Sequence, residues 1–455
     1  MKEGGKMELN SNILSNLCNE FKEYNNINPA DFKKYQVKCG LRNEDGTGVM
    51  AGLTCICNIR GYVVDDGERV PVEGTLNYRG ISVNDIVNGC IRDNRFGFEE
   101  VIWLLLFGEL PSKSTLDMFC QVLDENRALP ESFAEDMIMK APSRNIMNKL
   151  ARSVLALYSY DDDPDNIDIK NVLAQCISII AKIPGIMAYA YQVKRRFFDG
   201  ESMFVHPLKP GLSTAETILR SIRNDTVFTD EEAKLLDLCL ILHADHGGGN
   251  NSTFTTRVLT SSHTDTYSTL SAAIGSLKGP RHGGANLKVS EMLEYMMKEV
   301  PADADDSVIR DYLIRLVRRE AGDRSGLIYG MGHAVYTMSD PRAVILKEQA
   351  QKVVAGTELE REFELLKKIE RLAPGVLNEV KGNDKMICAN VDLYSGLIYR
   401  ALHIPSDLFT PLFAVARMPG WCAHRLEELT TGGRIIRPAY KAVSKNRKYI
   451  SLNDR

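Results

Sequence analysis

Residues 243–286 read HADHGGGNNSTFTTRVLTSSHTDTYSTLSAAIGSLKGPRHGGAN. An apolar run ends here and brings two histidines, His243 and His246, into a glycine-rich turn. A long segment of small residues then leads to His282, which stands just before the next helical pattern. Few purely structural segments place so many titratable residues and glycines beside so much apolar sequence. The functional question is therefore which group these histidines face.

The bulk composition indicates a globular protein and does not predict a nucleic-acid or membrane partner. The chain has 455 residues, which is enough for two or three domains, with a hydrophobic share of 44% and a charged share of 25%. A formal net charge of -4 gives no general attraction to nucleic acid, and no apolar run approaches the roughly 20 residues that span a bilayer. The N-terminus has neither a signal-peptide core nor a transit-peptide bias. We therefore expect a cytoplasmic protein with no nucleic acid and no membrane as partner.

The hydrophobic pattern predicts a mostly α fold with little sheet. From Asn84 onward, apolar residues recur at spacings of three and four, which is typical of helices with one buried face. Before that point, short β-like runs predict one small hairpin. These runs cover 55–59, 62–64 and 76–83, around a turn at 65–67. The expected helices cover 98–107, 116–123, 146–158, 172–193, 230–242, 288–298, 308–321, 341–354, 358–372, a segment from Asp392, and 421–429.

His282 precedes the sequence Gly-Gly-Ala-Asn and a helical pattern. A histidine at a helix N-terminus meets unpaired backbone N–H groups and the positive end of the helix dipole. This setting disfavours the imidazolium and keeps a neutral ring, which can donate a hydrogen bond to a developing oxyanion. A core histidine in a tight turn is the alternative interpretation.

His333 follows Leu-Ile-Tyr-Gly-Met-Gly, and the two glycines indicate backbone that a ligand approaches closely, or a hinge. The pattern is not GxGxxG and no βαβ unit surrounds it, so it does not predict a dinucleotide site. Nearby, Asp340-Pro341-Arg342 predicts a helix start with an arginine in the first turn. A cation there opposes the helix dipole, so Arg342 indicates a nearby anion. An arginine that points into solvent is the alternative.

Asp392 and two further arginines stand beside apolar sequence. Asp392 follows Met-Ile-Cys-Ala-Asn-Val and is either a common N-cap residue or a partly buried general base, which the sequence alone does not separate. Arg417 and Arg437 also lie in apolar surroundings, which usually means a paired anion. With Arg342 they would clamp a small di- or tricarboxylate by bidentate contacts. Structural ion pairs with the chain's own acids are the alternative.

Taken together, these residues give the chain a strong resemblance to citrate synthase, from Gly40 to Pro438. Any one of the matching stretches is a moderate signal, whereas all of them in this order are very specific. The stretches are Leu76–Ile81, Phe98–Val101, Gly108–Pro111, His243–Asn250, Gly279–Asn286, Gly330–Val335, Asp340–Arg342, Asn390–Gly396 and Arg417 with Gly420–His424.

The resemblance implies a mostly α, two-domain, multi-helical homodimer with a small β-hairpin near the N-terminus. The large domain would comprise 1–282 and 392–455, and the small domain, 283–391, would close over the active site. The implied enzyme is an acyltransferase that condenses acetyl-CoA with oxaloacetate and water to give citrate and CoA, through an enol and citryl-CoA. Acetyl-CoA would be a co-substrate, and the resemblance implies no permanently bound cofactor and no metal ion.

The resemblance also implies a role for each candidate residue. Asp392 matches the base that takes a proton from the acetyl methyl group. His282 matches the neutral histidine that stabilises the enol, and His333 matches the histidine that polarises the oxaloacetate carbonyl and protonates the alkoxide. The implied oxaloacetate ligands are His246, Arg342, Arg417 and Arg437, the last of which would be supplied across the dimer.

For CoA, the resemblance is less complete. Many family members carry a basic residue four positions after the second catalytic histidine, where this chain has Thr337. Our hypothesis is that Arg281, beside His282, compensates for it. The implied CoA contacts are Ile328, Tyr329, Gly330, Met331 and Gly332 at the adenine end, and Arg42 at a phosphate.

Three other functions compete with this interpretation. A 2-methylcitrate synthase would share the fold and catalytic residues but use propionyl-CoA, and one methylene in an apolar pocket is worth only about 1–3 kcal/mol. A metal-dependent hydrolase would use His243, Asp245 and His246, although three glycines follow at once and no further cluster has ligand spacing. A non-catalytic helical scaffold would not need His282, His333 and Asp392 in their glycine-flanked settings.

Overall fold

The structure is a computed structural model that describes residues 11–44, 46–65 and 68–455. It divides into two compact units. The first comprises Ile436–Arg455 and the described residues up to Gly52, and it contains α1 (Ser11–Tyr24), α2 (Pro29–Lys34) and two short 3₁₀ turns. The second, Leu53–Ile435, contains every other helix and strand of the described chain.

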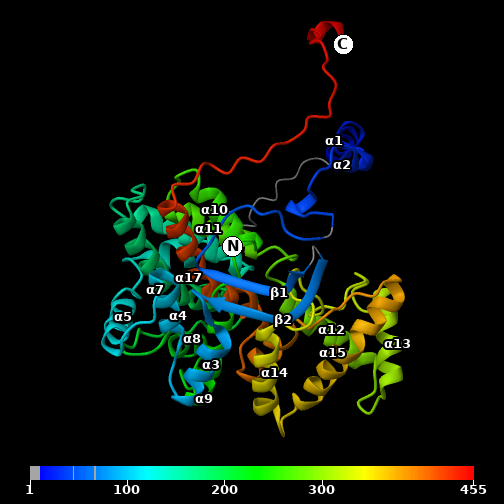
Figure 1. The fold of residues 1–455 in the computed structure, drawn as a ribbon. Helices are drawn as coiled ribbons and strands as arrows, with labels where there is room; N and C mark the ends of the chain where they lie inside the picture. Colours follow the sequence, from blue (N-terminus) through cyan, green and yellow to red (C-terminus); the bar gives the residue numbers. More distant parts are fainter. Residues whose placement is uncertain (1–10, 45, 66–67) are drawn as a thin grey trace. The chain divides into compact units, whose positions relative to one another are not determined.

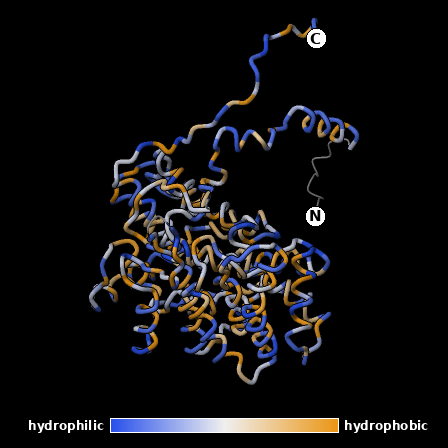
Figure 2. The backbone as a smooth tube through the Cα atoms, turned by 45° about the vertical axis from the view of Figure 1, so that its right-hand side comes forward, coloured by the Kyte–Doolittle hydropathy of each residue, from blue (hydrophilic) through white to orange (hydrophobic). Residues whose placement is uncertain are grey.

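The second unit is a helical body with one small sheet, as the sequence predicts (Figure 1). Apolar and polar residues alternate along most of its helices, as expected for helices with one buried face (Figure 2). In chain order its elements are β1 (Cys57–Asp65), β2 (Glu68–Tyr78), β3 (Ile81–Ser82), α3 (Val83–Arg92), α4 (Phe98–Phe107), α5 (Lys113–Glu125), η2 (Ala134–Met139), α6 (Ile146–Ala156), η3 (Leu157–Tyr160), α7 (Ile169–Lys194), η4 (Arg195–Asp199), α8 (Thr214–Ile222), α9 (Asp230–His243), α10 (Asn251–Thr260), α11 (Thr266–Leu277), α12 (Ala285–Glu299), α13 (Asp306–Val317), α14 (Pro341–Val354), α15 (Glu360–Lys381), α16 (Asp392–Ala401), η5 (Ser406–Leu408) and α17 (Phe409–Thr430).

Local sequence signals explain where several of these helices begin and end. Thr229 caps α9 and forms a capping box with Glu232, because each residue's side chain accepts a hydrogen bond from the other's backbone N–H. Gly108 ends α4 in the left-handed conformation, with φ of 93°. The start of α9 and the end of α4 thus follow from local sequence.

The predicted hairpin is present, although its strands are longer than the sequence indicates. The sheet is antiparallel with the order β1-β2-β3, and its register shifts between Arg60 and Tyr62. Of the predicted turn, residues 66 and 67 lie outside the described residues. The sequence missed residues 68–75, because Pro71 and Gly74 are uncommon inside strands. Both are tolerated in this exposed hairpin, and Gly74 packs tightly against Ser339.

The long helix α7 lies at the centre of the packing. With η4 it is the one described helix that is long and apolar enough to cross a membrane by length and composition alone. In the structure, however, 61% of its most apolar window is buried among other helices. Such burial is typical of a core helix, and α7 packs against α6, α8 and α17.

Two helices are longer than the sequence predicts. The prediction is too short because each helix contains proline, which locally disfavours helix. The sequence predicts a last helix over 421–429, but α17 begins at Phe409 and contains Pro411 and Pro419. Pro411 falls in the first turn, where a backbone N–H has no helical partner. Pro419 lies in the interior and is fully buried, so tertiary packing outweighs its local cost. In the same way, α15 continues past Pro374 to Lys381.

Helices α12–α16 pack largely among themselves. Their principal contacts are α13 with α15, α14 with α16, and α12 with α16 (Figure 1). The β1–β2 hairpin lies beside this group, and β2 contacts both α4 and α14. The expected domain boundaries at 282 and 392 stay a prediction.

Candidate active site

The C-terminal end of α9 delivers the first histidines. His243 is the last residue of α9, and its Nδ1 donates to the carbonyl of Cys239 at 2.9 Å. His246 follows in the glycine turn, and its ring lies edge-on to His333 with centroids 5.0 Å apart. Burial, together with the nearby Arg342, holds the pKa of His246 well below its ordinary value. His246 is therefore a neutral ring at neutral pH.

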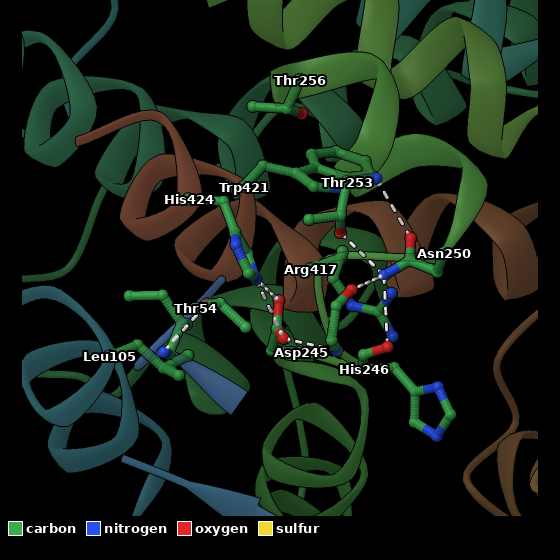
Figure 3. A network of polar contacts seen from close by, with 12 residues as sticks. Thr54, Leu105, Asp245, His246, Asn250, Thr253, Thr256, Arg417, Trp421 and His424 are labelled. Carbon is green, nitrogen blue, oxygen red and sulfur yellow. Dashed lines mark hydrogen bonds and ion pairs between the residues drawn. The ribbon is translucent and has the colours of Figure 1, made fainter. Parts of the chain in front are cut away.

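One face of α17 packs along this turn. Arg417, Gly420, Trp421 and His424 are spaced by three and four residues, so they share one face of the helix. Nε of Arg417 donates to the carbonyl of His243 at 2.7 Å. At Gly420 the helix approaches so closely that an added Cβ would lie 2.4 Å from the carbonyl oxygen of residue 244. The turn is thus held by helices rather than by solvent-exposed loops (Figure 3).

His282 is held by the N-terminus of α10. Its Nε2 accepts a hydrogen bond from the backbone N–H of Ser252 at 3.2 Å and lies 2.8 Å from the Ser252 hydroxyl. The sequence predicts that the helix after His282 keeps this ring neutral, and that prediction is wrong in its choice of helix. α12 begins three residues later, and the donor belongs to the first turn of α10. Burial, with help from Arg417, lowers the pKa of His282 to about 4.

His333 is set by its own loop. Its Nδ1 accepts hydrogen bonds from the backbone N–H groups of Val335 and Tyr336, at 3.0 and 3.1 Å. An acceptor nitrogen carries no proton, so the proton of the neutral ring is on Nε2. The preceding glycines, Gly330 and Gly332, have φ of 81° and 92°, as the predicted close backbone approach requires.

The β-hairpin braces the same loop. Gly74 N–H donates to the Ser339 hydroxyl at 3.1 Å, and the Tyr336 hydroxyl donates to the carbonyl of Thr75 at 3.2 Å. At Gly61 an added Cβ would lie 2.6 Å from the carbonyl oxygen of Val335. The two strand glycines therefore allow the hairpin to lie directly against the His333 loop.

Asp392 is the first residue of α16, and its backbone N–H donates to Oδ1 of Asn390 at 3.0 Å. The N-cap interpretation is wrong, because the N-cap residue is Val391. Nδ2 of Asn390 also donates to the carbonyl of Gly332 at 2.8 Å, which ties the His333 loop to Asp392. Burial raises the pKa of Asp392 to about 6, the range expected of a general base.

The two candidate anion-binding arginines that lie in the second unit, Arg342 and Arg417, are buried. Nε and Nη2 of Arg342 donate to Asp340 at 3.0 and 2.7 Å, so the solvent-exposed interpretation of Arg342 is wrong. Burial would lower the pKa of Arg342, but the Asp340 carboxylate outweighs it and raises the pKa. Arg417 has no carboxylate within ion-pair distance among the described residues, and its Nη2 is buried without a hydrogen-bond partner there. Nε2 of His246 is likewise buried without a hydrogen-bond partner among the described residues.

These atoms fit a small anionic ligand. A buried guanidinium N–H without a partner costs free energy, and a bound carboxylate would supply the missing acceptor. The surrounding charge favours such a ligand, because Arg342 and Arg417 are both close enough to lower the pKa of His246. Among the described residues, no group of three or more His, Cys, Asp or Glu is arranged to hold a metal ion. The hydrolase interpretation is therefore not supported, since Asp245 pairs instead with His424.

The structure brings six predicted residues of the second unit together, and two further predicted residues belong to the first unit. His246, His282, His333, Arg342, Asp392 and Arg417 form one cluster, linked by the ring contact and the electrostatic interactions above. Arg42 and Arg437 belong to the first unit, where both are exposed, and Nη1 of Arg42 donates to the carbonyl of Gly46.

The predicted adenine-end CoA residues, Ile328–Gly332, directly precede His333 in the same loop. In Ile328–Gly332, Ile328 is buried, and the Tyr329 hydroxyl donates to Asp323 at 2.7 Å. Gly332 N–H donates to the carbonyl of Cys388 at 2.7 Å. The Thr337 hydroxyl donates to the carbonyl of Gly61, whereas Arg281 is exposed beside His282.

Sequence reasoning missed the residues that hold the others in place. Ser252 fixes His282, Asn390 joins two loops, and Asp340 pairs with Arg342. His424 on α17 and Asp245 in the histidine turn form a buried pair. Polar residues spaced by three and four in the apolar sequence of α17 were a usable signal for His424. No local signal identifies Ser252, because its partner lies 30 residues away.

Comparisons with known proteins agree with this geometry. A family model described as the citrate synthase C-terminal domain matches residues 44–439. The chain is 33% identical over 391 residues to a citrate synthase from Synechocystis sp., covering 84% of this chain and 89% of that protein. It is 29% identical over 428 residues to 2-methylcitrate synthase 1 from Corynebacterium glutamicum, covering 92% of this chain and 99% of that protein.

A solved structure shares the fold. It is the ternary complex of carboxymethyl coenzyme A and oxaloacetate with citrate synthase from Thermoplasma acidophilum. The similarity has a TM-score of 0.74 at 25% identity, and it covers 92% of this chain and 99% of that one. From the matched family model and the extent of these alignments, the chain belongs to the citrate synthase family of acyltransferases.

Proposed function

We propose that this enzyme condenses acetyl-CoA with oxaloacetate and water to give citrate and CoA. One observation carries the proposal: a carboxyl group with a pKa near 6 stands with two neutral histidines whose ring protons are fixed by backbone contacts, next to two buried arginines. Carbon–carbon bond formation needs a base, a donor for the enolate oxygen and an acid for the second carbonyl.

Asp392 is the proposed base. As the carboxylate, it takes a proton from the methyl group of acetyl-CoA, whose C–H electrons then form the enolate. A pKa of about 6 leaves the group ionised at neutral pH while making it a stronger base than an exposed aspartate. At the first turn of α16, its backbone N–H is hydrogen-bonded to the Asn390 side chain, which fixes the backbone that carries the carboxylate.

His282 is the proposed donor to the enolate oxygen. Because Nε2 accepts the Ser252 N–H, the proton of the neutral ring is on Nδ1, which is left to donate. The low pKa of His282 keeps the ring neutral at neutral pH. The neutral ring stabilises the enolate oxygen through a hydrogen bond from Nδ1–H.

His333 is the proposed acid for oxaloacetate. Its Nε2–H polarises the ketone carbonyl, the methyl carbon of the enolate attacks that carbon, and the new alkoxide takes the proton from Nε2. Water then hydrolyses the thioester of citryl-CoA, which releases CoA as the free thiol and leaves the third carboxylate of citrate.

Oxaloacetate binding falls to His246, Arg342 and Arg417. The unpartnered Nη2 of Arg417 supplies one donor to a carboxylate, and the buried Arg342 supplies the opposite charge. Our proposal includes a homodimer in which Arg437 of one protomer reaches the site of its partner. Arg437 is exposed on an extended segment of the first unit, which leaves it available for such a role. A cytoplasmic location stays a prediction.

CoA binding is proposed for Ile328–Gly332, Arg42 and Arg281. Arg281 is exposed, with no hydrogen bond or ion pair described for its side chain, and it adjoins His282. If it replaces the cation missing at Thr337, Arg281→Ala should raise the KM for acetyl-CoA roughly tenfold and leave the KM for oxaloacetate within about twofold. An unchanged KM for acetyl-CoA would rule out this contact.

The proposal is tested by the release of free thiol from acetyl-CoA and from propionyl-CoA, each with oxaloacetate. A higher kcat/KM with acetyl-CoA that depends on Asp392 supports the citrate synthase reaction. A higher kcat/KM with propionyl-CoA would instead identify a 2-methylcitrate synthase with the same mechanism. No thiol release from either thioester would contradict the proposed function.

A further inference from the structure

A chain of buried polar groups runs from α17 into the turn that carries His246. His424 on α17 and Asp245 in the turn are both 0% exposed. Nε2 of His424 lies 3.3 Å from Oδ1 of Asp245 (Figure 3). Its Nδ1 lies 2.7 Å from Nη2 of Arg257. None of these three groups belongs to the reaction described above, yet their burial makes every one of their contacts energetically significant.

The contact with Arg257 fixes the tautomer of His424. A guanidinium group only donates, so Nδ1 accepts and the proton of the ring is on Nε2, which donates to Asp245. Arg257 is itself held by carboxylates, because it donates to Glu427 and, through Nη1, to Glu428 at 2.8 Å. Both the orientation and the protonation of His424 are thus set by α10 and the end of α17.

Asp245 connects His424 to the backbone of the histidine turn. Its Oδ1 accepts the backbone N–H of Gly247 at 2.8 Å, so the carboxylate closes the turn around His246. Gly247 has φ of 76°, a conformation that favours glycine. Figure 3 shows the His246 ring pointing away from Asp245. The carboxylate therefore acts on the backbone of the turn and not on the face that meets the ligand.

Asp245 also supports Arg417. Burial would raise the pKa of Asp245, but His424, Arg417 and the Gly247 N–H together lower it to about 2. Conversely, burial lowers the pKa of Arg417, and Asp245 is the largest charge that opposes this effect. The carboxylate is therefore an anion that keeps the buried guanidinium charged in the absence of ligand.

We propose that His424 and Asp245 are positioning residues for oxaloacetate binding, through which α17 fixes the turn that presents His246 to the substrate beside Arg417 of the same helix. The inference rests on the proposed function, because it assigns these residues to the oxaloacetate side of that reaction. The inference gives the two hydrogen bonds of His424 different roles. The bond to Asp245 fixes the turn that carries His246, whereas the bond with Arg257 fixes only the ring of His424.

Two substitutions of His424 separate the two bonds. In His424→Gln the amide nitrogen occupies the place of Nε2 and keeps the donor to Asp245. In His424→Asn the amide oxygen occupies the place of Nδ1 and keeps the acceptor for Arg257, but Asp245 loses its donor. We expect His424→Asn to raise the KM and Kd for oxaloacetate roughly tenfold, with kcat and the KM for acetyl-CoA within about threefold, and His424→Gln to stay within about threefold throughout.

Melting temperatures and oxaloacetate titrations by calorimetry accompany the kinetics. A merely structural role would lower the melting temperature of both variants without separating their oxaloacetate affinities. Equal KM and Kd values in the two variants would therefore overturn the inference, and so would a His424→Asn chain that fails to fold while His424→Gln folds normally. Wild-type enzyme without thiol release would contradict the proposed function instead, so the two failures are distinguishable.

Gly420→Ala gives a second test that leaves His424 and Arg257 intact. Its Cβ would lie 2.4 Å from Oδ2 of Asp245, so α17 or the turn must move. The inference predicts a KM for oxaloacetate raised by at least roughly tenfold in the folded variant. A folded Gly420→Ala enzyme with the wild-type KM would contradict it.

Discussion

The turn that carries His246 is held between α9, α10 and α17, whereas the loop that carries His333 rests on a hairpin and on glycines with positive φ. In the first region the supporting side chains, Asp245 and His424, are fully buried. In the second, His333 is half-buried and its ring is set by backbone N–H groups of its own loop. The difference teaches that the turn carrying His246 rests on packed helices, whereas the loop carrying His333, the proposed acid, is joined by Asn390 to Asp392, the proposed base at the start of α16.

The largest effect is expected where the loop region supplies the base. Asp392→Asn removes the only group proposed to take the methyl proton, so kcat should fall roughly 10²- to 10⁴-fold, with the KM for oxaloacetate within about threefold. Thiol release measures kcat, and calorimetry measures oxaloacetate affinity. Activity that survives in this variant would mean that another group is the base. The proposed difference between the His246 turn and the His333 loop region would then be wrong.

The next effect concerns the glycine that positions the His333 loop. An added Cβ at Gly330 would lie 2.7 Å from Cδ1 of Leu393, and its φ of 81° disfavours any side chain. Gly330→Ala should therefore lower kcat roughly 10- to 100-fold. Gly249→Ala is the matched control in the histidine turn, where no atom lies within 4 Å of the added Cβ. Similar losses in the two variants would mean that both turns are equally sensitive to backbone strain.

The pH dependence of the base gives a smaller effect. Burial raises the pKa of Asp392 to about 6, so the carboxylate is protonated as the pH falls through that value. We expect kcat/KM for acetyl-CoA to fall about fivefold between pH 6 and pH 5. A profile that stays flat to pH 5 would contradict the raised pKa and the role of Asp392 as base.

The same pKa shift affects stability with a definite sign. The ordinary pKa is 3.8, so the folded protein holds this proton more tightly than the unfolded chain. The cost of the buried carboxylate is therefore fully present above pH 6 and is relieved as the pH falls towards 4. Asp392→Asn should raise the melting temperature by roughly 2 °C at pH 7, with a smaller gain at pH 4.

The two regions also differ in how far the sequence predicts them. The glycines before His333 predict a close backbone approach, and the structure gives them positive φ for that reason. The helical support of His246 was underestimated, because Pro411 and Pro419 locally disfavour α17, and only burial in the assembled fold stabilises it. The role of Ser252 depends on a contact across 30 residues, which no local pattern contains. Sequence reasoning therefore identifies the reacting groups better than the residues that hold them.

The smallest effect is expected at Ser252. Its hydroxyl contacts Nε2 of His282 and accepts a hydrogen bond from Nε1 of Trp421, but its backbone N–H also donates to Nε2 and remains in Ser252→Ala. Because one of the two contacts persists, the tautomer of His282 should persist with it, and kcat should fall only about three- to tenfold. Ser252→Ala also leaves the Trp421 N–H without its acceptor, so a lowered melting temperature is expected alongside. A kcat loss as large as that of Asp392→Asn would show that the hydroxyl itself sets the proton on His282, and that the helix N-terminus alone does not hold this ring.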